Sequence, residues 1–346
     1  MIAHNRPHIT KEDRAAVDRV LQSGWIAQGV EVNALEAGFA DLLGGGDACA
    51  VSSGTAALFL ALKALGAGEG WKVAVPTYAC SALLNAVHHA GASPVLADVM
   101  SDTFCMDPSH RVLEDADIVI AVNTYGAQAD LRAIRRTGQK VIEDCCHSLG
   151  AVHRPQDEEG DAAIFSFYAT KLITGGQGGL VWARGTATAE AVRDYRQFDC
   201  RESYQPRFNL QMTDLQAALI NSQMRRLKNI RQRRQDIAQT YLSALPDGLT
   251  AQSRTIGSES IPYRFVVCAP GRAVRDALKQ HLSDAGVGSA VPIERYELLH
   301  RYLNLSPQDF PVAERLADVT LSLPVHTGLT DEEIDHVVHT IRSFHP

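Results

Sequence analysis

Lys171 is one of seven lysines in this chain of 346 residues, and its setting suits covalent chemistry. It follows an apolar run at residues 162–167 that is typical of a buried strand, and it precedes four glycines within residues 175–179. A lysine that is partly removed from water has a lowered pKa, so its neutral amine can form a Schiff base with a carbonyl compound. Glycines beside it let the backbone approach a ligand closely. The commoner meaning of this pattern is a solvated lysine before an ordinary turn.

Asp144 and His147 are two further titratable residues: Asp144 ends the run Val-Ile-Glu-Asp at residues 141–144, and His147 lies three residues later. A carboxylate at the end of a strand is usually a plain helix cap. Its functional alternative is a carboxylate that stays ionised and pairs with a protonated ring nitrogen. A histidine three residues later more often supports its neighbours than acts as a catalyst.

A possible anion site lies within residues 48–62, where a strand turns through Ser52, Ser53 and Gly54 into a helix that starts near Thr55. A helix begins with free N–H groups and the positive end of its dipole, and both favour a phosphate. The alternative is a serine or threonine N-cap without a ligand, which is the commoner use of such residues.

Apolar runs and amphipathic stretches alternate through the first half of the chain. Strands are predicted at residues 48–51, 72–75, 94–98, 118–125, 140–144, 162–167 and 179–183, and helices at 10–23, 32–43, from 55 on, 80–90 and 131–136. This alternation predicts an α/β fold, with a mainly parallel sheet covered on both faces. Ligands of such sheets bind at the carboxyl ends of the strands. We therefore expect Tyr78, Asn123, Asp144 and Lys171 to converge with the turn before Thr55.

In the second half of the chain, the sequence pattern predicts a long helix followed by a smaller domain. The helix runs from residue 209 to about 245, has a capping box at Thr213 and Gln216, and carries a basic cluster that predicts a solvated or subunit-contact face. Residues 246–260 are polar and predict a linker. After them come predicted strands at 264–268, 287–291 and 321–324, and helices at 273–285, 312–319 and 331–344. The predicted domains are therefore 1–245 and 246–346.

Composition excludes several classes of protein. The chain is 45% hydrophobic and 21% charged with a net charge of −7, which is ordinary for a globular protein and argues against a general nucleic-acid binder. It has no apolar run of 18 residues, and its N-terminus lacks the apolar core of a signal peptide. Its seven cysteines form no C-x-x-C, so neither a zinc site nor a disulfide framework is expected. We expect a cytoplasmic protein without a membrane or nucleic-acid partner.

Short segments along nearly the whole chain match, in order, those of a known family. The segments are residues 6–10, 21–24, 51–58 (VSSGTAAL), 76–79, 91–95, 124–126, 141–144 (VIED), 165–171 (FSFYATK), 212–218, 310–317 and 321–324. With these segments the chain resembles the DegT/DnrJ/EryC1/StrS family of pyridoxal-phosphate sugar aminotransferases. The resemblance implies a transferase of fold type I, with a large domain that binds the cofactor and a small C-terminal α+β domain.

The resemblance also implies roles at the cofactor site. Lys171 would form the Schiff base with pyridoxal 5′-phosphate and later move a proton between substrate and cofactor carbons. Asp144 would pair with the pyridine nitrogen, which makes the ring an electron sink. Tyr78 would stack on the ring, and His147 would lie beside the cofactor hydroxyl.

Phosphate binding and a shared site follow from the same resemblance. Thr55 and Ala56 would bind the phosphate through their backbone N–H groups and the Thr55 hydroxyl, with Gly54 in the same turn. Ser166 would join them. Asn209 resembles the asparagine with which this family reaches the cofactor phosphate of the neighbouring subunit. The implied assembly is a homodimer in which each subunit completes the other's site.

The implied reaction has two halves. L-glutamate aminates the cofactor and leaves as 2-oxoglutarate, and a keto-sugar, usually carried by a nucleotide, then accepts the amino group. The alternative acceptors are a cyclitol, a ketone in antibiotic biosynthesis or a small phosphorylated ketone. A sugar dehydratase is disfavoured because such relatives replace the lysine at 171 with histidine. A regulator that only binds a ligand is disfavoured by the complete set of Lys171, Asp144 and Ser166, and a nicotinamide dehydrogenase by the lack of G-x-G-x-x-G after the first strand.

Four positions depart from the family's usual pattern. Asn123 stands where a histidine is common, Gln177 where a glutamate is common, and Gln211 where a basic residue is common. The segment around His300 lacks the usual histidine–tyrosine pair. These positions lie near the acceptor site in family members, so the nature of the acceptor stays open.

Overall fold

A seven-stranded sheet forms the centre of the molecule. The computed structural model describes residues 1–136, 138–150, 160–253 and 261–345. In sheet order the strands are β1 (Asp47–Val51), β7 (Gly179–Ala183), β6 (Ala162–Ser166), β5 (Lys140–Asp144), β4 (Ile118–Val122), β2 (Lys72–Pro76) and β3 (Ser93–Ala97). β7 runs antiparallel to both of its neighbours, and the other strands run parallel to one another. The predicted mainly parallel sheet is therefore confirmed.

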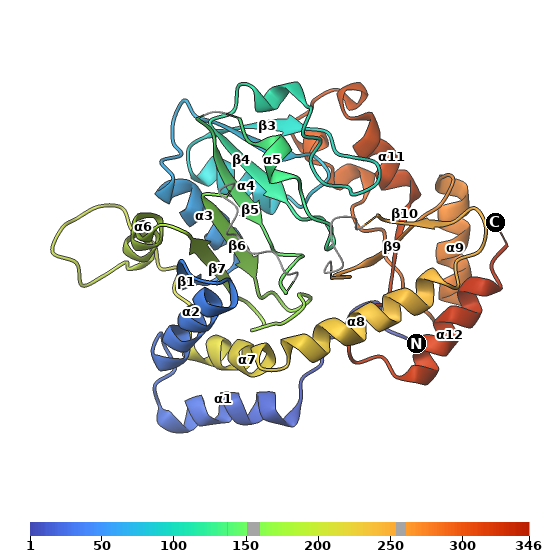
Figure 1. Ribbon diagram of the computed structural model, residues 1–346, viewed down its shortest axis with the longest axis horizontal. Helices are drawn as coiled ribbons and strands as arrows, with labels where there is room; N and C mark the ends of the chain where they lie inside the picture. Colours follow the sequence, from blue (N-terminus) through green and yellow to red (C-terminus); the bar gives the residue numbers. More distant parts are fainter. Residues whose placement is uncertain (137, 151–159, 254–260, 346) are drawn as a thin grey trace.

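Helices cover both faces of this sheet (Figure 1). Most of its strand residues are apolar, and the helices bury them. The helices on one face are α3 (Gly54–Ala64) and α4 (Ala82–His89), and those on the other include α2 (Val30–Leu42), α5 (Leu131–Ile134) and α7 (Asp214–Met224). The predicted strand at 118–125 ends at Val122, since Tyr125 and Gly126 have φ angles of 55° and 102° and leave the extended conformation.

A three-stranded antiparallel sheet organises the second half of the chain. Its order is β10 (Thr320–Leu323), β9 (Phe265–Cys268), β8 (Thr250–Ala251), and around it lie α9 (Arg272–Asp284), α11 (Pro311–Val319) and α12 (Asp331–Arg342). The short α10 (Leu299–Tyr302) packs instead on the core of the large sheet, where the Leu299 N–H donates to the Thr77 carbonyl. The core of this part also contains Ile2 and the end of α8 (Leu227–Leu242). Both termini of the chain therefore lie at the smaller sheet (Figure 1). The domain boundary after residue 245 stays a prediction.

The predicted long helix is wrong in two respects. It begins at Asp214 and not at 209, because Thr213 is the N-cap and forms the predicted capping box with Gln216. It is also broken into α7 and α8, where Arg226 leaves the helical conformation with a φ of −112° and a ψ of 14°. The Arg226 guanidinium pairs with the buried Asp13 of α1 (Lys11–Ser23), so the break is fixed by a contact far away in sequence.

The predicted strand at 287–291 is also wrong. Val287 forms a single bridge with Ile2, and Ala290 forms one with Ser322, so the segment changes partner instead of pairing along one strand. Gly288 makes this change possible, because a Cβ atom there would lie 2.9 Å from the backbone of His4. Of the predicted linker at 246–260, residues 254–260 lie outside the described residues.

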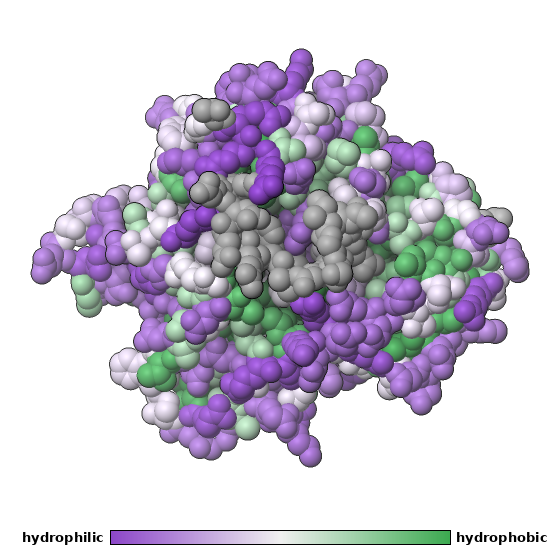
Figure 2. Space-filling model, in the orientation of Figure 1, coloured by the Kyte–Doolittle hydropathy of each residue, from purple (hydrophilic) through white to green (hydrophobic). Residues whose placement is uncertain are grey.

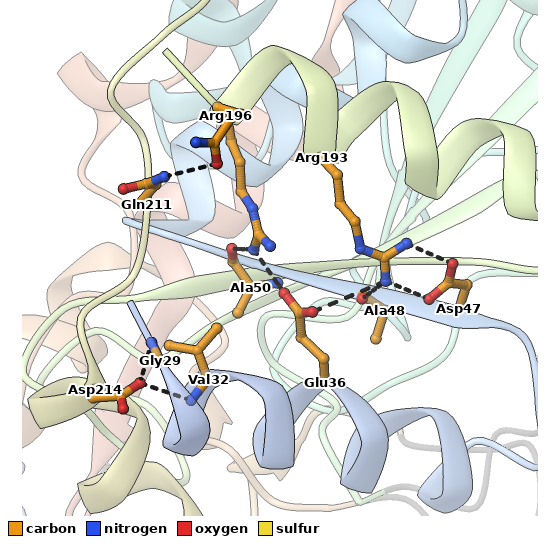
Figure 3. Close-up of polar contacts among 11 residues, drawn as sticks. Gly29, Val32, Glu36, Asp47, Ala48, Ala50, Arg193, Arg196, Gln211 and Asp214 are labelled. Carbon is orange, nitrogen blue, oxygen red and sulfur yellow. Dashed lines mark hydrogen bonds and ion pairs between the residues drawn. The ribbon is translucent and has the colours of Figure 1, made fainter. Parts of the chain in front are cut away.

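One helix that the sequence pattern did not predict, α6 (Thr186–Arg196), is attached to β1 by two arginines (Figure 3). Arg193 donates to Asp47 Oδ2 at 2.7 Å and to the Ala48 carbonyl at 2.7 Å. Arg196 is 5% exposed and pairs with Glu36 of α2 at 2.6 Å. This network joins α2, β1 and α6 at the edge of the sheet.

The start of α2 is capped by a residue from another helix. The carboxylate of Asp214 accepts hydrogen bonds from the N–H groups of Gly29 at 2.8 Å and Val32 at 3.0 Å (Figure 3). The N-cap position itself is Gly29, which has no side chain to satisfy these donors. The predicted helix at 32–43 therefore starts two residues early, at Val30.

The basic cluster of the second half is used largely inside the molecule, and not only as the predicted solvated or subunit-contact face. Arg234 is 4% exposed and donates to the carbonyls of Pro262 at 3.2 Å and Tyr263 at 3.0 Å. Arg231 donates to the Gly150 carbonyl. Burial lowers the pKa of Arg234 to about 10, which still leaves it charged at neutral pH. Arg234 thus fixes the chain just before β9.

The face of the molecule shown in Figure 2 is mostly hydrophilic, and hydrophobic atoms gather on its right, over the smaller sheet and α9 of Figure 1. Within the described ranges, no helix is both long and apolar enough to span a membrane. The same ranges contain no group of three or more histidine, cysteine or carboxylate side chains that could bind a metal.

Candidate active site

A cavity of about 340 Å³ lies at the carboxyl edge of the large sheet. It is lined by the last residues of three adjacent strands, Val122 of β4, Asp144 of β5 and Ser166 of β6. Seven predicted site residues line it: Gly54, Thr55, Tyr78, Asp144, His147, Ser166 and Lys171. This is the edge where a mainly parallel sheet binds its ligands.

Lys171 lies in the turn after β6, with its amine 5.1 Å from the centre of the Tyr263 ring. Burial acts to lower the pKa of Lys171, but the Tyr263 phenol, the Cys146 thiol and the Asp144 carboxylate outweigh burial and raise the pKa. The prediction that burial lowers the pKa of Lys171 is therefore wrong for the isolated chain. That prediction could not include acidic groups that come from distant segments.

Asp144 is 5% exposed at the end of β5, and its Oδ1 accepts a hydrogen bond from the Cys146 N–H at 2.9 Å. Burial raises the pKa of Asp144, while the hydrogen bonds from Cys146 and the charge of Lys171 act in the opposite direction. A cation placed against this carboxylate would lower its pKa and favour the ionised form.

Cys80 and Cys146 bring two thiols into the cavity, and the sequence pattern predicted neither. Both thiols interact electrostatically with Asp144 and Lys171. Tyr78 also lines the cavity, but it is 1% exposed and its hydroxyl forms a 3.1 Å hydrogen bond with Thr320 Oγ1 of β10. The predicted stacking of Tyr78 on a ring stays a prediction, and Cys80 is the more exposed of the two side chains.

The turn before α3 forms a concave surface beside Ser166. Ser53 is the N-cap of α3, and its Oγ accepts the Ala56 N–H at 3.1 Å. Gly54 is required, because a Cβ there would lie 2.8 Å from the Ser166 Cβ. Thr55 lines the cavity, whereas Ala56 does not. The turn therefore combines a helix N-terminus with two hydroxyl groups, which suits an anion.

Three rings are stacked along one wall of the cavity. His147 lies between Tyr263, at 4.2 Å and 8° between planes, and Tyr125, at 5.5 Å and 23°. Burial, together with the charges of Lys171 and Arg264, holds the pKa of His147 well below its ordinary value, so the imidazole is neutral. His147 Nδ1 is buried and has no hydrogen-bond partner among the described residues. A neutral ring nitrogen is thus available to a ligand.

Tyr263 and Arg264 were not predicted as site residues. They reach the cavity because Arg234 holds the backbone at 262–263, and because Gly126 allows Ile261 to approach the loop after β4. The only signal in the sequence was an aromatic and a basic residue side by side just before an apolar strand.

Several predicted residues lie elsewhere. Asn209 is exposed and does not line the cavity of its own chain. Asn123 does not join the cavity as we expected, because its amide donates to Glu143 at 2.7 Å and to Ser148 at 3.0 Å. Gln211 donates to Gln197, and His300 is fully buried against Phe310. Of the four departures from the family pattern, Gln177 lines the cavity, as do Pro292 and Ile293 of the segment before His300.

The sheet, the cavity and its lysine define the class of the aminotransferases of fold type I. The model of the DegT/DnrJ/EryC1/StrS aminotransferase family matches residues 7–342, and the chain belongs to this family. It is 35% identical over 347 residues to the erythromycin biosynthesis sensory transduction protein EryC1 of Saccharopolyspora erythraea, with 95% of this chain and 94% of the relative covered.

Solved structures agree with this assignment. The aminotransferase TlmJ from Streptoalloteichus hindustanus is 30% identical and superposes with a TM-score of 0.90, covering 99% of this chain and 98% of its own. The putative sugar aminotransferase Spr1654 from Streptococcus pneumoniae, in its PLP-form, is 26% identical with a TM-score of 0.88 and covers 99% and 98% of the two chains. The predicted family and fold are therefore confirmed.

Proposed function

We propose that the chain is a pyridoxal-phosphate-dependent aminotransferase that transfers the amino group of L-glutamate to the keto group of a nucleotide-linked sugar. The observation that carries this proposal is the convergence of Lys171, Asp144 and a neutral His147 on one cavity, beside the N-terminus of α3. Membership of an aminotransferase family supports the reaction class. We place the reaction in amino-sugar biosynthesis, in the cytoplasm.

Pyridoxal 5′-phosphate fits the residues that line the cavity. Its phosphate suits the turn of Gly54 and Thr55 with Ser166, because that turn offers a helix N-terminus and hydroxyl groups. Its ring nitrogen suits the buried Asp144, and its hydroxyl suits the unpartnered Nδ1 of His147. Lys171 supplies the amine for the aldehyde carbon.

The bound cofactor supplies an electron-withdrawing ring that stabilises negative charge on the substrate carbon. The Asp144 carboxylate would keep a proton on the ring nitrogen, since a buried anion is stabilised by an adjacent cation. Lys171 Nζ, once free of the cofactor, would take the proton from one carbon and deliver it to another. Tyr263 would orient Lys171 through the contact of its ring with the amine.

The acceptor is the least constrained part of the proposal. A cavity of about 340 Å³ is at the lower end for ligand sites, so a nucleotide carrier would extend beyond it. This volume also favours the second candidate, a cyclitol or a small phosphorylated ketone that needs no carrier. A dehydratase remains disfavoured because residue 171 is lysine. The name of the relative EryC1 describes sensory transduction, and turnover with a keto-acceptor would distinguish an enzyme from such a regulator.

We further propose a homodimer with shared sites. Asn209 is exposed and outside the cavity of its own chain, which is the placement that a residue donated to a neighbour requires. The exposed side chains of Trp25 and Val30, 65% and 77% accessible, offer apolar surface for the contact.

An absorbance spectrum of the purified protein, before and after L-glutamate, tests the cofactor and the donor together. We expect a yellow protein that bleaches with L-glutamate and regains its colour with 2-oxoglutarate. Lys171→Ala should fold normally, judged by circular dichroism, but lack turnover. A protein that stays colourless with added pyridoxal phosphate would contradict the cofactor assignment, and normal turnover of Lys171→Ala would contradict the role of the lysine.

A further inference from the structure

Arg264 places a guanidinium in the wall of the cavity without an assigned role. It lines the cavity together with Lys171 and His147, and it is the only arginine among those lining residues that the structure describes. Its Nη1 is buried and has no hydrogen-bond partner within the described ranges. A buried guanidinium N–H without an acceptor is costly, so an acceptor from a ligand would relieve that cost.

The backbone that carries Arg264 is held firmly. Arg234 of α8 bonds the carbonyls of Pro262 and Tyr263, immediately before Arg264. The Tyr263 N–H bonds the Ile261 carbonyl at 2.8 Å, and β9 begins directly after Arg264. The side chain therefore extends from a fixed point, as a recognition residue should.

The guanidinium lies against the rings of Tyr125 and Tyr263, with its Cζ 5.6 and 5.9 Å from the ring centres. These contacts orient the planar group without using its N–H donors. The Tyr263 ring also contacts the Lys171 amine at 5.1 Å. One aromatic ring thus contacts both the reacting amine and the guanidinium.

We propose that Arg264 binds a carboxylate of the amino donor and so selects amino acids as donors. This inference rests on the proposed function. An amino acid must present its nitrogen at the atom to which Lys171 bonds, and it carries a carboxylate a few atoms away. The guanidinium fork matches a carboxylate through two parallel hydrogen bonds. The turn before α3 provides a separate anion site for the cofactor phosphate, so Arg264 is free for the substrate.

A phosphate group of a nucleotide-linked acceptor is the other anion that a guanidinium could bind. The two sources are separable, because donor and acceptor react with the enzyme in separate half-reactions. A donor-binding residue affects only the half-reaction with L-glutamate, whereas a residue that binds the nucleotide affects only the other half.

The test compares the holoenzyme with Arg264→Gln and Arg264→Lys, and with Arg315→Gln as a matched control. Arg315 is an exposed arginine of α11 that does not line this cavity. The rate of bleaching by L-glutamate is measured under single-turnover conditions at a series of concentrations. Calorimetric titrations with glutarate, an unreactive dicarboxylate, and with uridine diphosphate measure binding without chemistry.

We expect Arg264→Gln to raise the half-saturating concentration of L-glutamate and the Kd of glutarate at least about tenfold. Arg264→Lys should give a smaller rise, because it keeps the charge and loses the fork. Uridine diphosphate binding, cofactor affinity and Arg315→Gln should match the wild type. Unchanged L-glutamate and glutarate binding in Arg264→Gln, or a loss of uridine diphosphate binding instead, would overturn the inference while the proposed function stands. A wild-type protein indifferent to L-glutamate would refute the proposed donor, and this site with it.

Discussion

At the scale of single residues, the pKa of each titratable group in the cavity depends on several neighbouring groups. Lys171 is half-buried, yet its pKa is raised, because Tyr263, Cys146 and Asp144 together outweigh the effect of burial. Burial acts to raise the pKa of the Tyr263 phenol, but the positive charges of Lys171 and Arg264 outweigh burial and lower that pKa. A protonated amine beside acidic groups is a stable resting state for the cavity. A carbonyl compound that bonds the amine must therefore displace a proton first.

Alkylation of Cys80 tests whether pyridoxal phosphate binds in this cavity. The Cys80 thiol lines the cavity near Lys171 and Asp144, and burial raises the pKa of the thiol. We expect iodoacetamide to alkylate Cys80 slowly at neutral pH and faster at higher pH, since only the thiolate reacts. Added pyridoxal phosphate should slow this alkylation by roughly fivefold or more. Peptide mapping by mass spectrometry measures each cysteine separately.

Cys200 is the matched control for this labelling, because it is exposed and does not line the cavity. Its alkylation should not respond to pyridoxal phosphate. If the cofactor protects both thiols equally, or neither, the cofactor does not bind beside Cys80.

Gly126 is a second residue on which the site depends. Its φ is 102°, and a Cβ there would lie 1.7 Å from the Ile261 carbonyl oxygen. Gly126→Ala should therefore displace the segment that carries Tyr263 and Arg264, and lower kcat/KM by at least about tenfold. Steady-state kinetics and urea unfolding measure the two consequences.

Gly248→Ala is the matched control, because it introduces backbone strain at a positive φ angle without displacing a neighbouring segment. Gly248 has a φ of 88°, and no atom lies within 4 Å of the position that its Cβ would take. This variant should lose about 1–2 kcal/mol of unfolding free energy and keep its activity. An active Gly126→Ala enzyme would show that the approach of Ile261 is not needed for the site.

At the scale of secondary-structure elements, α6 and α2 are joined through Glu36, which pairs with the buried Arg196 and, at 3.9 Å, with Arg193. Glu36 of α2 accepts hydrogen bonds from Arg196 at 2.6 Å and from the Ala50 N–H at 2.8 Å. Glu36→Gln would leave Arg196 as a buried cation without its counter-charge, so we expect a loss of about 3 kcal/mol in the free energy of unfolding. Urea unfolding at one fixed protein concentration measures it.

Arg233→Gln is the matched control for a surface pair. The Arg233 guanidinium contacts Asp331 at 2.6 Å, but the aspartate side chain is 81% accessible. Its removal should cost under about 1 kcal/mol. Equal losses in the two variants would mean that the pair of Glu36 and Arg196 is not desolvated in solution.

The sequence was sufficient for elements whose signals are local. β5 and β7 have the predicted bounds, and the capping box of Thr213 and Gln216 starts α7 as predicted. It was insufficient where a distant contact decides the outcome. The break between α7 and α8 depends on the pairing of Arg226 with Asp13, which no local pattern contains.

The same limit applies to the candidate site. Asp144, Ser166 and Lys171 lie at or just after strand ends, so the geometry of a parallel sheet predicts that they meet. Tyr263 and Arg264 precede a strand of the smaller sheet, and they reach the cavity through Arg234 and Gly126. Asn123 was predicted to face the site and does not. The loop that follows β4 binds its side chain, because the Ala129 N–H donates to Asn123 Oδ1.

At the scale of the whole molecule, buried neutral histidines make the fold sensitive to acid. Burial, with the charges of Arg264 and His326, lowers the pKa of His4 from 6.5 to about 4, and the pKa values of His147, His300 and His326 are lowered too. Each histidine binds a proton more readily in the unfolded chain. Its contribution to stability is therefore complete above pH 6.5 and is lost as the pH falls toward the folded pKa.

His4→Gln tests this for the N-terminal segment. His4 bonds Ser322 Oγ at 2.9 Å, which a glutamine can replace without a titration. Between about pH 7.5 and about pH 5.5 the wild type should lose roughly 1 kcal/mol more unfolding free energy than His4→Gln, after allowance for partial exposure. His8→Gln, at an exposed histidine, should behave like the wild type. A pH dependence unchanged in His4→Gln would mean that the fold does not lower the pKa of His4.

Subunit mixing tests whether two chains share each site. In the proposed homodimer, one chain supplies Lys171 and its partner supplies Asn209. Lys171→Ala and Asn209→Glu should each be nearly inactive, the second because it opposes the cofactor phosphate with a negative charge. A mixed dimer contains one site with both defects and one site with neither. Equal amounts of the two variants, unfolded and refolded together, should therefore recover roughly a quarter of wild-type activity.

Sedimentation before and after mixing checks that dimers form. If dimers exchange and no activity returns, Asn209 serves the site of its own chain, and the exposed position of Asn209 has another explanation.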